Sequence, residues 1–231
     1  MPELECMLEM PVFAEIKPVE KYKLLQVINS TNYSPGEIIF NQGEDMNKVY
    51  FVKRGKITLK TIFPSGEEIA LGIVGPNEIM GAKSFSANKK HISTARALED
   101  SFLCTCDMLE LKNFMRENPR IAIKIIENIG EKLEDRELKV SELAAFDVRR
   151  RLIALLQRMA EKFGVEKEKG IEIDLNLTHQ EIADFIGASR VMVSNILQEI
   201  NGVTAYRGKV IIEDLSLLED GERKQREYTG I

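Results

Sequence analysis

The chain has 231 residues, of which 44% are apolar and 30% charged, and its formal net charge is −5. This length accommodates two domains, and the composition is typical of a soluble globular protein. No apolar stretch approaches the ~18 residues of a membrane span. The amino terminus, Met-Pro-Glu-Leu-Glu, has no basic segment followed by an apolar run, so we expect no signal peptide and a cytoplasmic location.

Residues 34–107 carry the pattern of short β-strands. Residues 49–52 and 56–62 are two of the segments with strand-like alternation. Turn residues separate such segments at Ser34-Pro-Gly36, Gly43, Arg54-Gly55, Pro64-Ser-Gly66 and Gly75-Pro-Asn77. Turn signals at a spacing of about ten residues predict a β-barrel or sandwich-like domain. A short helix is predicted before it, over residues 19–29.

The three cysteines, Cys6, Cys104 and Cys106, are odd in number and form no disulfide framework. Cys104 and Cys106 lie two apart in a predicted strand, so both face the same side. We expect them to be buried thiols. The alternative is a metal or iron–sulfur site, which here lacks a fourth ligand and a Cys-x-x-Cys spacing.

From Asn118-Pro119 onward the periodicity becomes helical. Apolar residues recur at spacings of three or four with one arginine among them: Ile121, Ile125, Ile129, Leu133, Arg136, Val140 and Leu143. The series predicts a helix of about seven turns, longer than most globular helices. Its apolar seam needs a partner, and a second copy of the chain would give a parallel two-stranded coiled coil. Packing against the β domain is the alternative.

Shorter elements are predicted after the long helix. Asp147 can cap a helix over residues 148–163. A charged connection over residues 164–170 leads to a short strand at 171–175. Residues 203–212 predict a small hairpin, or wing, and the charged tail over residues 219–231 is expected to fray.

Residues 178–200 carry the most specific pattern, that of a helix-turn-helix. Thr178 and Glu181 form a capping box that starts the first helix, and Gly187 supplies the turn. The apolar residues give each helix an inward face: Ile182, Ala183, Ile186, Val193, Ile196 and Leu197. The outward face is mostly small and polar, with one arginine, which an ordinary helical hairpin would not explain. We therefore predict that the second helix enters the DNA major groove.

The acidic net charge is the main objection to DNA binding, but phosphate contact depends on local charge, and a dimer needs only one basic face. The residues that could form this face are Arg149, Arg150, Arg151, Arg190, Arg207 and Lys209. For the arginine triplet, a solvated helix face is the alternative. The predicted DNA-binding residues are Ser189, Arg190, Val191, Ser194, Asn195, His179, Arg207 and Lys209.

A β domain, a long helix and a winged helix-turn-helix, in this order, resemble the CRP/FNR family of bacterial transcription regulators. The matching segments are Tyr33-Ser-Pro-Gly-Glu, Asn41-Gln-Gly-Glu, Val49-Tyr-Phe-Val-Lys-Arg-Gly-Lys-Ile, Gly66-Glu-Glu, Asn118-Pro, Asp147-Val and the helix-turn-helix. The resemblance implies an α+β fold with three parts. A double-stranded β-helix (a cupin-like β-roll of the cyclic-nucleotide-binding type) would span residues 1–117, a dimerisation helix 118–146, and a winged helix-turn-helix domain 147–231.

The resemblance also implies a homodimer that binds palindromic double-stranded DNA and contacts RNA polymerase. An effector held beside the central helices would re-set the DNA-binding domains about a hinge near Asp147. The expected effector-binding residues are Glu78, Gly81, His91, Ile92, Lys132, Arg136 and Glu137.

This sequence differs from the cyclic-AMP receptors at positions that contact their effector. His91 stands where they carry the phosphate-binding Arg, and Ile92 replaces the adjacent Ser. Arg136 and Glu137 replace the Thr-Ser pair that reads adenine. A cyclic phosphate would lose its bidentate partner and one hydroxyl donor, so cyclic AMP is not expected.

The nitrogen regulators that sense 2-oxoglutarate have a closer pattern. They carry an Arg in the segment that corresponds to the phosphate-binding cassette of the cyclic-AMP receptors, an Arg on the long helix, and a Glu five residues after that second Arg. His91, Lys132 and Glu137 fall at those places. We therefore expect a small anionic effector held by Lys132, with His91 or Arg136 assisting. For His91, which follows Lys89-Lys90, a solvent-exposed loop residue is the alternative.

Other family cofactors are not expected. The FNR-type iron–sulfur site needs four cysteines, and the haem members carry a His where Ala82-Lys83 stand. The alternative to an effector is a regulator controlled by abundance, or by thiol chemistry at Cys6, Cys104 or Cys106. No nucleophile–base pair or metal-ligand cluster is visible, so enzymatic activity is not expected.

Overall fold

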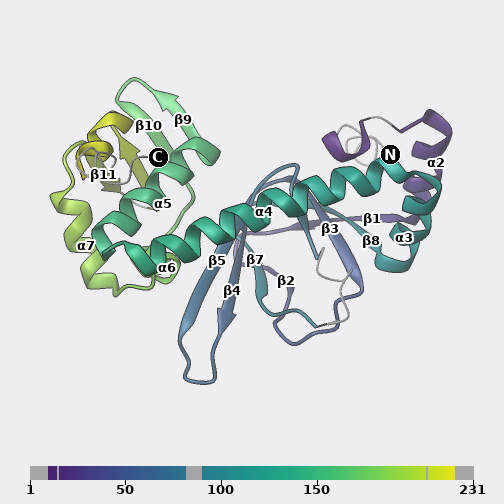
Figure 1. Ribbon diagram of the computed structural model, residues 1–231, viewed down its shortest axis with the longest axis horizontal. Helices are drawn as coiled ribbons and strands as arrows, with labels where there is room; N and C mark the ends of the chain where they lie inside the picture. Colours follow the sequence, from purple (N-terminus) through teal and green to yellow (C-terminus); the bar gives the residue numbers. More distant parts are fainter. Residues whose placement is uncertain (1–9, 15, 82–89, 207, 222–231) are drawn as a thin grey trace. The chain divides into compact units, whose positions relative to one another are not determined.

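The computed structural model describes residues 10–14, 16–81, 90–206 and 208–221. The chain forms two compact units, residues 1–137 and 138–231, which divide within helix α4 (Pro119–Ala145) (Figure 1). Each unit is described by itself. The domain boundaries expected from the sequence, at 117/118 and 146/147, stay predictions.

The described part of unit 1 begins with the 3-10 turn η2 (Pro11–Phe13) and helix α2 (Pro18–Val27). The Glu20 carboxylate accepts a hydrogen bond from the Lys17 backbone amide at 2.9 Å, which fixes the start of α2. The helix predicted over residues 19–29 ends at Val27, because Ile28 opens a strand that pairs along its length with another. The β domain therefore begins before residue 34.

Unit 1 contains two four-stranded antiparallel sheets. Their strand orders are β1-β8-β3-β6 and β2-β7-β4-β5, so strands distant in sequence lie side by side. The strands are β1 (Ile28–Tyr33), β2 (Ile38–Phe40), β3 (Lys48–Arg54), β4 (Ile57–Ile62), β5 (Glu68–Val74), β6 (Ile79–Met80), β7 (Thr94–Ala97) and β8 (Ser101–Asp107). The predicted β domain is confirmed, and we call it the β-roll.

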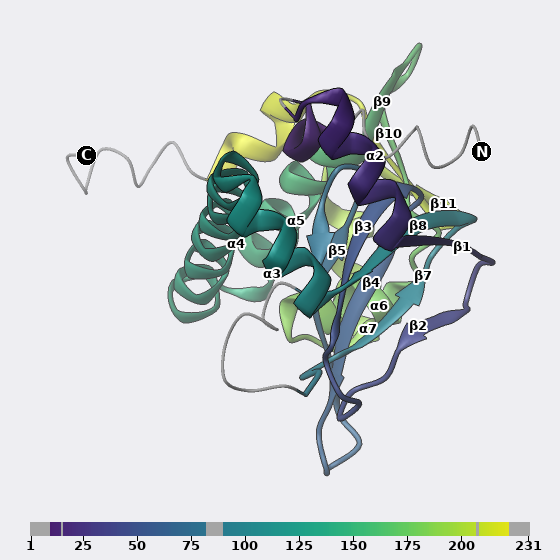
Figure 2. The same cartoon turned by 90° about the vertical axis from the view of Figure 1, so that its right-hand side faces the viewer.

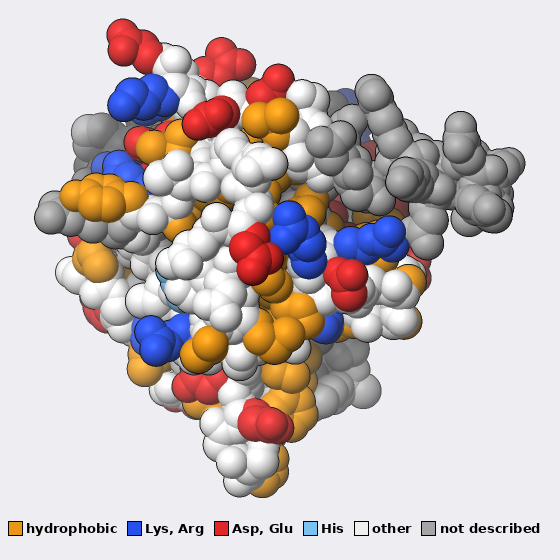
Figure 3. Space-filling view, turned by 90° about the vertical axis from the view of Figure 1, so that its left-hand side faces the viewer, with side chains coloured by type: hydrophobic (Ala, Val, Ile, Leu, Met, Phe, Trp, Pro, Cys, Tyr) orange, Lys and Arg blue, Asp and Glu red, His pale blue; other side chains and the backbone are white. Residues whose placement is uncertain are grey.

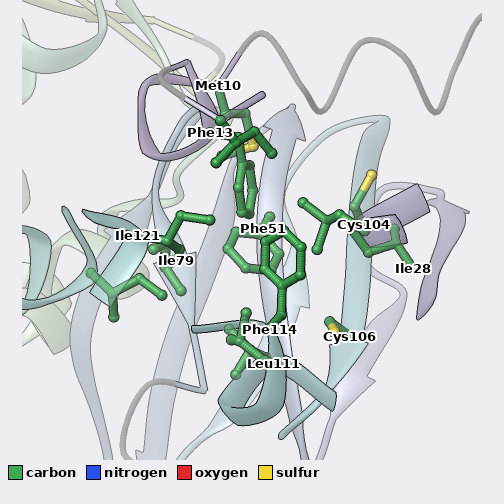
Figure 4. Packing of buried hydrophobic residues seen from close by; sticks show 14 of the residues in the cluster. Met10, Phe13, Ile28, Phe51, Ile79, Cys104, Cys106, Leu111, Phe114 and Ile121 are labelled. Carbon is green, nitrogen blue, oxygen red and sulfur yellow. The ribbon is translucent and has the colours of Figure 1, made fainter. Parts of the chain in front are cut away.

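Helices cover one end of the β-roll. Figures 1 and 2 show α2, α3 (Met108–Glu117) and the start of α4 gathered over β1, β3 and β8. The Phe13 and Phe51 rings meet in this core at 5.1 Å between centroids (Figure 4). Ile121 and Ile125 of α4 join it with 1% of their surface exposed. These two residues were predicted on a seam between copies of the chain, and the β-roll covers them instead.

Helix α4 confirms the predicted long helix and still exposes apolar side chains. Ile126 is 66% exposed, and Ile129, Leu133 and Val140 are exposed as well. Together with Arg136, these four residues follow a heptad spacing, with Ile126, Leu133 and Val140 at one set of positions and Ile129 and Arg136 at the other. We call these five residues the α4 seam. The expected packing against the β domain thus holds for the start of α4, and pairing of the rest with a second copy of the chain stays a prediction.

Unit 2 starts from helix α5 (Val148–Phe163), whose first turn is capped as predicted: the Asp147 carboxylate accepts a hydrogen bond from the Arg150 amide at 2.8 Å. The charged segment after α5 was predicted as a connection, but strand β9 (Gly164–Lys167) pairs there with β10 (Gly170–Asp174). The remaining elements are α6 (His179–Ile186), α7 (Arg190–Glu199), β11 (Val203–Tyr206), β12 (Lys209–Ile212) and the 3-10 helix η4 (Leu215–Gly221). The sheet order is β11-β12-β10-β9. Over the described ranges of both units, no helix is long and apolar enough to cross a membrane.

Candidate DNA-binding surface and effector pocket

The turn between α6 and α7 forms as predicted. The Thr178 hydroxyl accepts a hydrogen bond from the Glu181 amide at 3.1 Å, and the Glu181 carboxylate accepts one from the Thr178 amide at 3.0 Å. This capping box satisfies two backbone donors at the start of α6. Gly187 ends α6 with a φ of 62°, in the left-handed region where a side chain is costly.

Helix α7 presents most of the predicted reading residues. Arg190, Val191 and Asn195 are exposed on its outer face, while Ser194 is half-buried. The Ser189 hydroxyl accepts a hydrogen bond from the Met192 amide at 3.2 Å, so its first role is to cap the helix. Two further features are that His179 is half-buried at the first position of α6 and that Met192 is exposed. Sequence reasoning placed Val191 on the outer face but missed its exposed neighbour Met192.

Lys209, a predicted DNA-binding residue of the wing, has two carboxylate partners. Lys209 lies opposite Asp174 in the register of β12 and β10. Its ammonium is 2.8 Å from the Asp174 carboxylate and 3.2 Å from that of Glu172, and hydrogen bonds to both raise its pKa. Two carboxylates around one ammonium leave this part of the wing with a net negative charge, which disfavours phosphate contact. Arg207 lies outside the described residues.

The arginine triplet is mostly engaged within unit 2. The Arg149 guanidinium is 3.4 Å from the Glu199 carboxylate at the end of α7. Arg151 reaches the helix-turn-helix turn, 3.6 Å from where a Cβ on Gly187 would lie. These contacts tie α5 to the turn and to α7, and phosphate contact by the triplet stays a prediction. Figure 3 shows Lys and Arg side chains scattered among acidic and apolar ones on the face it presents.

Unit 1 contains a cavity of about 260 Å³ between the β-roll and α4. Apolar side chains predominate in its lining, which comprises Phe40, Met46, Leu59, Leu71, Ile79, Met80, Gly81, His91, Ile92, Ser93, Ile129, Lys132, Leu133 and Arg136. Five of the seven predicted effector residues are therefore brought together. Glu78 and Glu137 are not part of the lining.

His91 is an internal part of this pocket. Only 6% of its surface is exposed, and its ring stacks on that of Phe40 with 3.7 Å between centroids and 16° between planes. Burial lowers the pKa of the imidazole, while the Glu44 carboxylate opposes that shift. The alternative of a solvent-exposed loop residue is wrong. A neutral, stacked imidazole is also a poor substitute for an arginine that binds phosphate.

Lys132 already has partners inside unit 1. Its ammonium donates a hydrogen bond to the Ile79 carbonyl and lies 3.9 Å from the Glu78 carboxylate. Glu78 also accepts a hydrogen bond from the Gly75 amide at 2.6 Å. The Lys132 charge is thus compensated by Glu78. Arg136, one helical turn further along α4, is exposed and makes no ion pair with the part of the chain that is described.

Comparisons with known proteins agree with this architecture. Residues 30–118 match the family described as "Cyclic nucleotide-binding domain", and residues 150–220 match the "Crp-like helix-turn-helix domain". The chain belongs to the CRP/FNR family. Chains of this family regulate transcription by binding DNA, and the regulators that match this one are not enzymes. The predicted α+β fold with a β-roll and a winged helix-turn-helix is confirmed.

Individual relatives of this CRP/FNR chain differ in their ligands. The global nitrogen regulator of Nostoc sp. is 28% identical over 170 residues, covering 73% of this chain and 76% of that protein. The CRP-like cAMP-activated global transcriptional regulator of Mycobacterium tuberculosis is 26% identical, covering 93% and 95%. The structure of the c-di-GMP responsive regulator CLP of Xanthomonas campestris aligns with a TM-score of 0.75 at 21% identity, covering 86% of this chain and all of that one.

Two of the three cysteines of this CRP/FNR chain are core residues. Cys104 and Cys106 are buried on β8, facing the same side as predicted (Figure 4). Burial, with smaller contributions from Asp107 and Glu110, raises the pKa of Cys106 to about 12. A thiol in that state is a weak nucleophile, which argues against sensing at this position. Cys6 lies outside the described residues. Among the residues that are described, no group of three or more His, Cys, Asp and Glu could hold a metal ion.

Proposed function

We propose that the protein is an effector-gated, sequence-specific regulator that acts as a homodimer on palindromic DNA. The observation that carries the proposal is that Ile129, Leu133 and Arg136 line the pocket and also belong to the α4 seam. A ligand in the pocket would therefore touch the helix surface through which two copies would pair. A ligand that binds one arrangement of that surface better than another shifts the protein toward it.

Homodimerisation is supported by the composition of the α4 seam. The first of its residues, Ile126, is 66% exposed, and large exposed apolar patches mark interaction surfaces. The spacing suits a parallel pair with two-fold symmetry. On palindromic DNA, two copies of α7 would occupy half-sites about one helical turn apart. As family membership suggests, the bound dimer would then contact RNA polymerase, in the cytoplasm.

The gating is tested by measuring the DNA affinity of the full chain by fluorescence anisotropy, with a palindrome selected from random DNA. A metabolite library is first screened for compounds that raise the melting temperature. We expect at least one such compound to change DNA affinity by about tenfold or more. If stabilising compounds leave DNA affinity unchanged, the effector-gated function is refuted and control by abundance takes its place.

A further inference from the structure

The pocket of unit 1 has the size and lining of a site for a small, mainly apolar molecule. Its volume of about 260 Å³ compares with ~150 Å³ for an engineered cavity that binds benzene, so it accommodates a ligand of on the order of ten non-hydrogen atoms. A cyclic nucleotide is about twice that size. Aliphatic and aromatic side chains form most of the wall, and the imidazole of His91 is stacked and held neutral.

Only one of the two cations in the lining is available for a charged ligand. The ammonium of Lys132 is satisfied by the Ile79 carbonyl and the Glu78 carboxylate. Arg136 is exposed, and its guanidinium can bind a carboxylate through two parallel hydrogen bonds. The pocket therefore favours a ligand with one negative charge over one with two.

Arg136 also occupies a position on the α4 seam where a charged side chain disfavours pairing of the helices. In a parallel two-stranded coiled coil, the heptad position of Arg136 faces the same position of the other copy. Two guanidinium groups would then approach each other across the two-fold axis and repel. An anion bound to each Arg136 from its own pocket would remove that repulsion, which links pocket occupancy to the pairing of the helices.

We propose that the ligand of this pocket is a monocarboxylic acid with an apolar body, about ten non-hydrogen atoms in all. Its carboxylate binds Arg136, and its apolar body lies among Phe40, Leu59, Leu71 and Met80. When its charge is neutralised by the ligand, Arg136 allows the α4 seams of two copies to pack against each other. This regulatory consequence rests on the effector-gated homodimer proposed above, whereas the binding itself does not.

Calorimetry on the full chain tests the ligand class with four probes of matched size and one larger nucleotide. Phenylacetate and octanoate are the apolar acids, phenylacetamide is the uncharged counterpart, 2-oxoglutarate is the polar dianion, and cyclic AMP is the nucleotide. We expect at least one apolar acid to bind about tenfold or more tightly than phenylacetamide and than 2-oxoglutarate. Tighter binding of 2-oxoglutarate or cyclic AMP overturns the proposal, as does the absence of binding by both acids at millimolar concentration.

Two variants test the role of Arg136. In Arg136→Gln the preference for acid over amide is expected to disappear, with the affinity for phenylacetamide unchanged. Arg120→Gln, which removes an arginine from the start of the same helix, retains the preference. An unchanged acid affinity in Arg136→Gln refutes the assignment of the carboxylate partner. Melting temperatures of both variants confirm that they are folded.

DNA affinity measured with the same probes separates this inference from the proposed function. An apolar acid that binds without changing DNA affinity refutes the gating and leaves the ligand class intact. A change in DNA affinity caused by 2-oxoglutarate or cyclic AMP, with none caused by the acids, supports the gating and overturns the ligand class.

Discussion

Replacing Ile126 by lysine tests the α4 seam without entering the pocket, because Ile126 does not line it. Full burial of an isoleucine side chain stabilises by about 1.5–3 kcal/mol. Ile126 is 66% exposed, so pairing of two helices would bury about two-thirds of each side chain, worth ~2–4 kcal/mol for the two copies together. Ile126→Lys removes this stabilising burial and places two ammonium groups next to each other in the dimer.

The dissociation constant of the dimer is therefore expected to rise by about 30-fold to 1,000-fold, measured by sedimentation equilibrium. Glu134→Gln is the control, because it makes the same change in net charge at an exposed position of α4 off the seam. An Ile126→Lys protein that dimerises as tightly as the control would refute the placement of the interface.

Three further results are expected. Arg190 can pair with guanine and the Val191 methyls with a thymine methyl, so Val191→Glu should shift the preference at its base toward cytosine by ~1–3 kcal/mol in competition binding; an unchanged preference would remove Val191 from the reading set. Because two carboxylates compensate the charge of Lys209, Lys209→Ala should leave DNA binding and its salt dependence unchanged, whereas Arg190→Ala should weaken binding to cognate DNA. Equal losses of DNA affinity in the two variants would contradict the view that Lys209 is compensated within the wing. Burial lowers the pKa of His91, so as the pH falls the unfolded state binds the proton before the folded state does. The free energy of unfolding, measured by urea denaturation, should therefore decrease below about pH 6.5 in the wild type and decrease less in His91→Gln. The same pH dependence in both proteins would count against a buried, neutral His91.

Local signals in the sequence predicted the helix-turn-helix well. Thr178, Glu181 and Gly187 act within one or two turns of chain, and the structure keeps each in the role their spacing indicated. The same holds for Asp147 at the start of α5. Helix caps and left-handed glycines depend on residues within one or two turns of chain, so their positions can be predicted from the local sequence.

The errors concern partners that lie far away in the chain. A period of three or four shows that Ile121 and Ile125 share a helix face, but only the fold shows that the β-roll covers them. The pairing of Lys209 with Asp174, 35 positions earlier, depends on sheet register, which the sequence pattern alone does not show. His91 was judged from its charged neighbours, whereas its stacking on Phe40 depends on strand pairing across the β-roll.

The central claim, that two copies of the chain bind DNA together under the control of the pocket, is tested most directly by one titration. The full chain is titrated against the selected palindrome and against the same duplex with one half-site scrambled, each with and without the ligand found by calorimetry. The account predicts two chains per palindrome, a loss of about tenfold or more on the scrambled duplex, and a ligand-dependent change in the palindrome affinity. One chain per duplex, with equal affinity for both sites and no effect of the ligand, would contradict it.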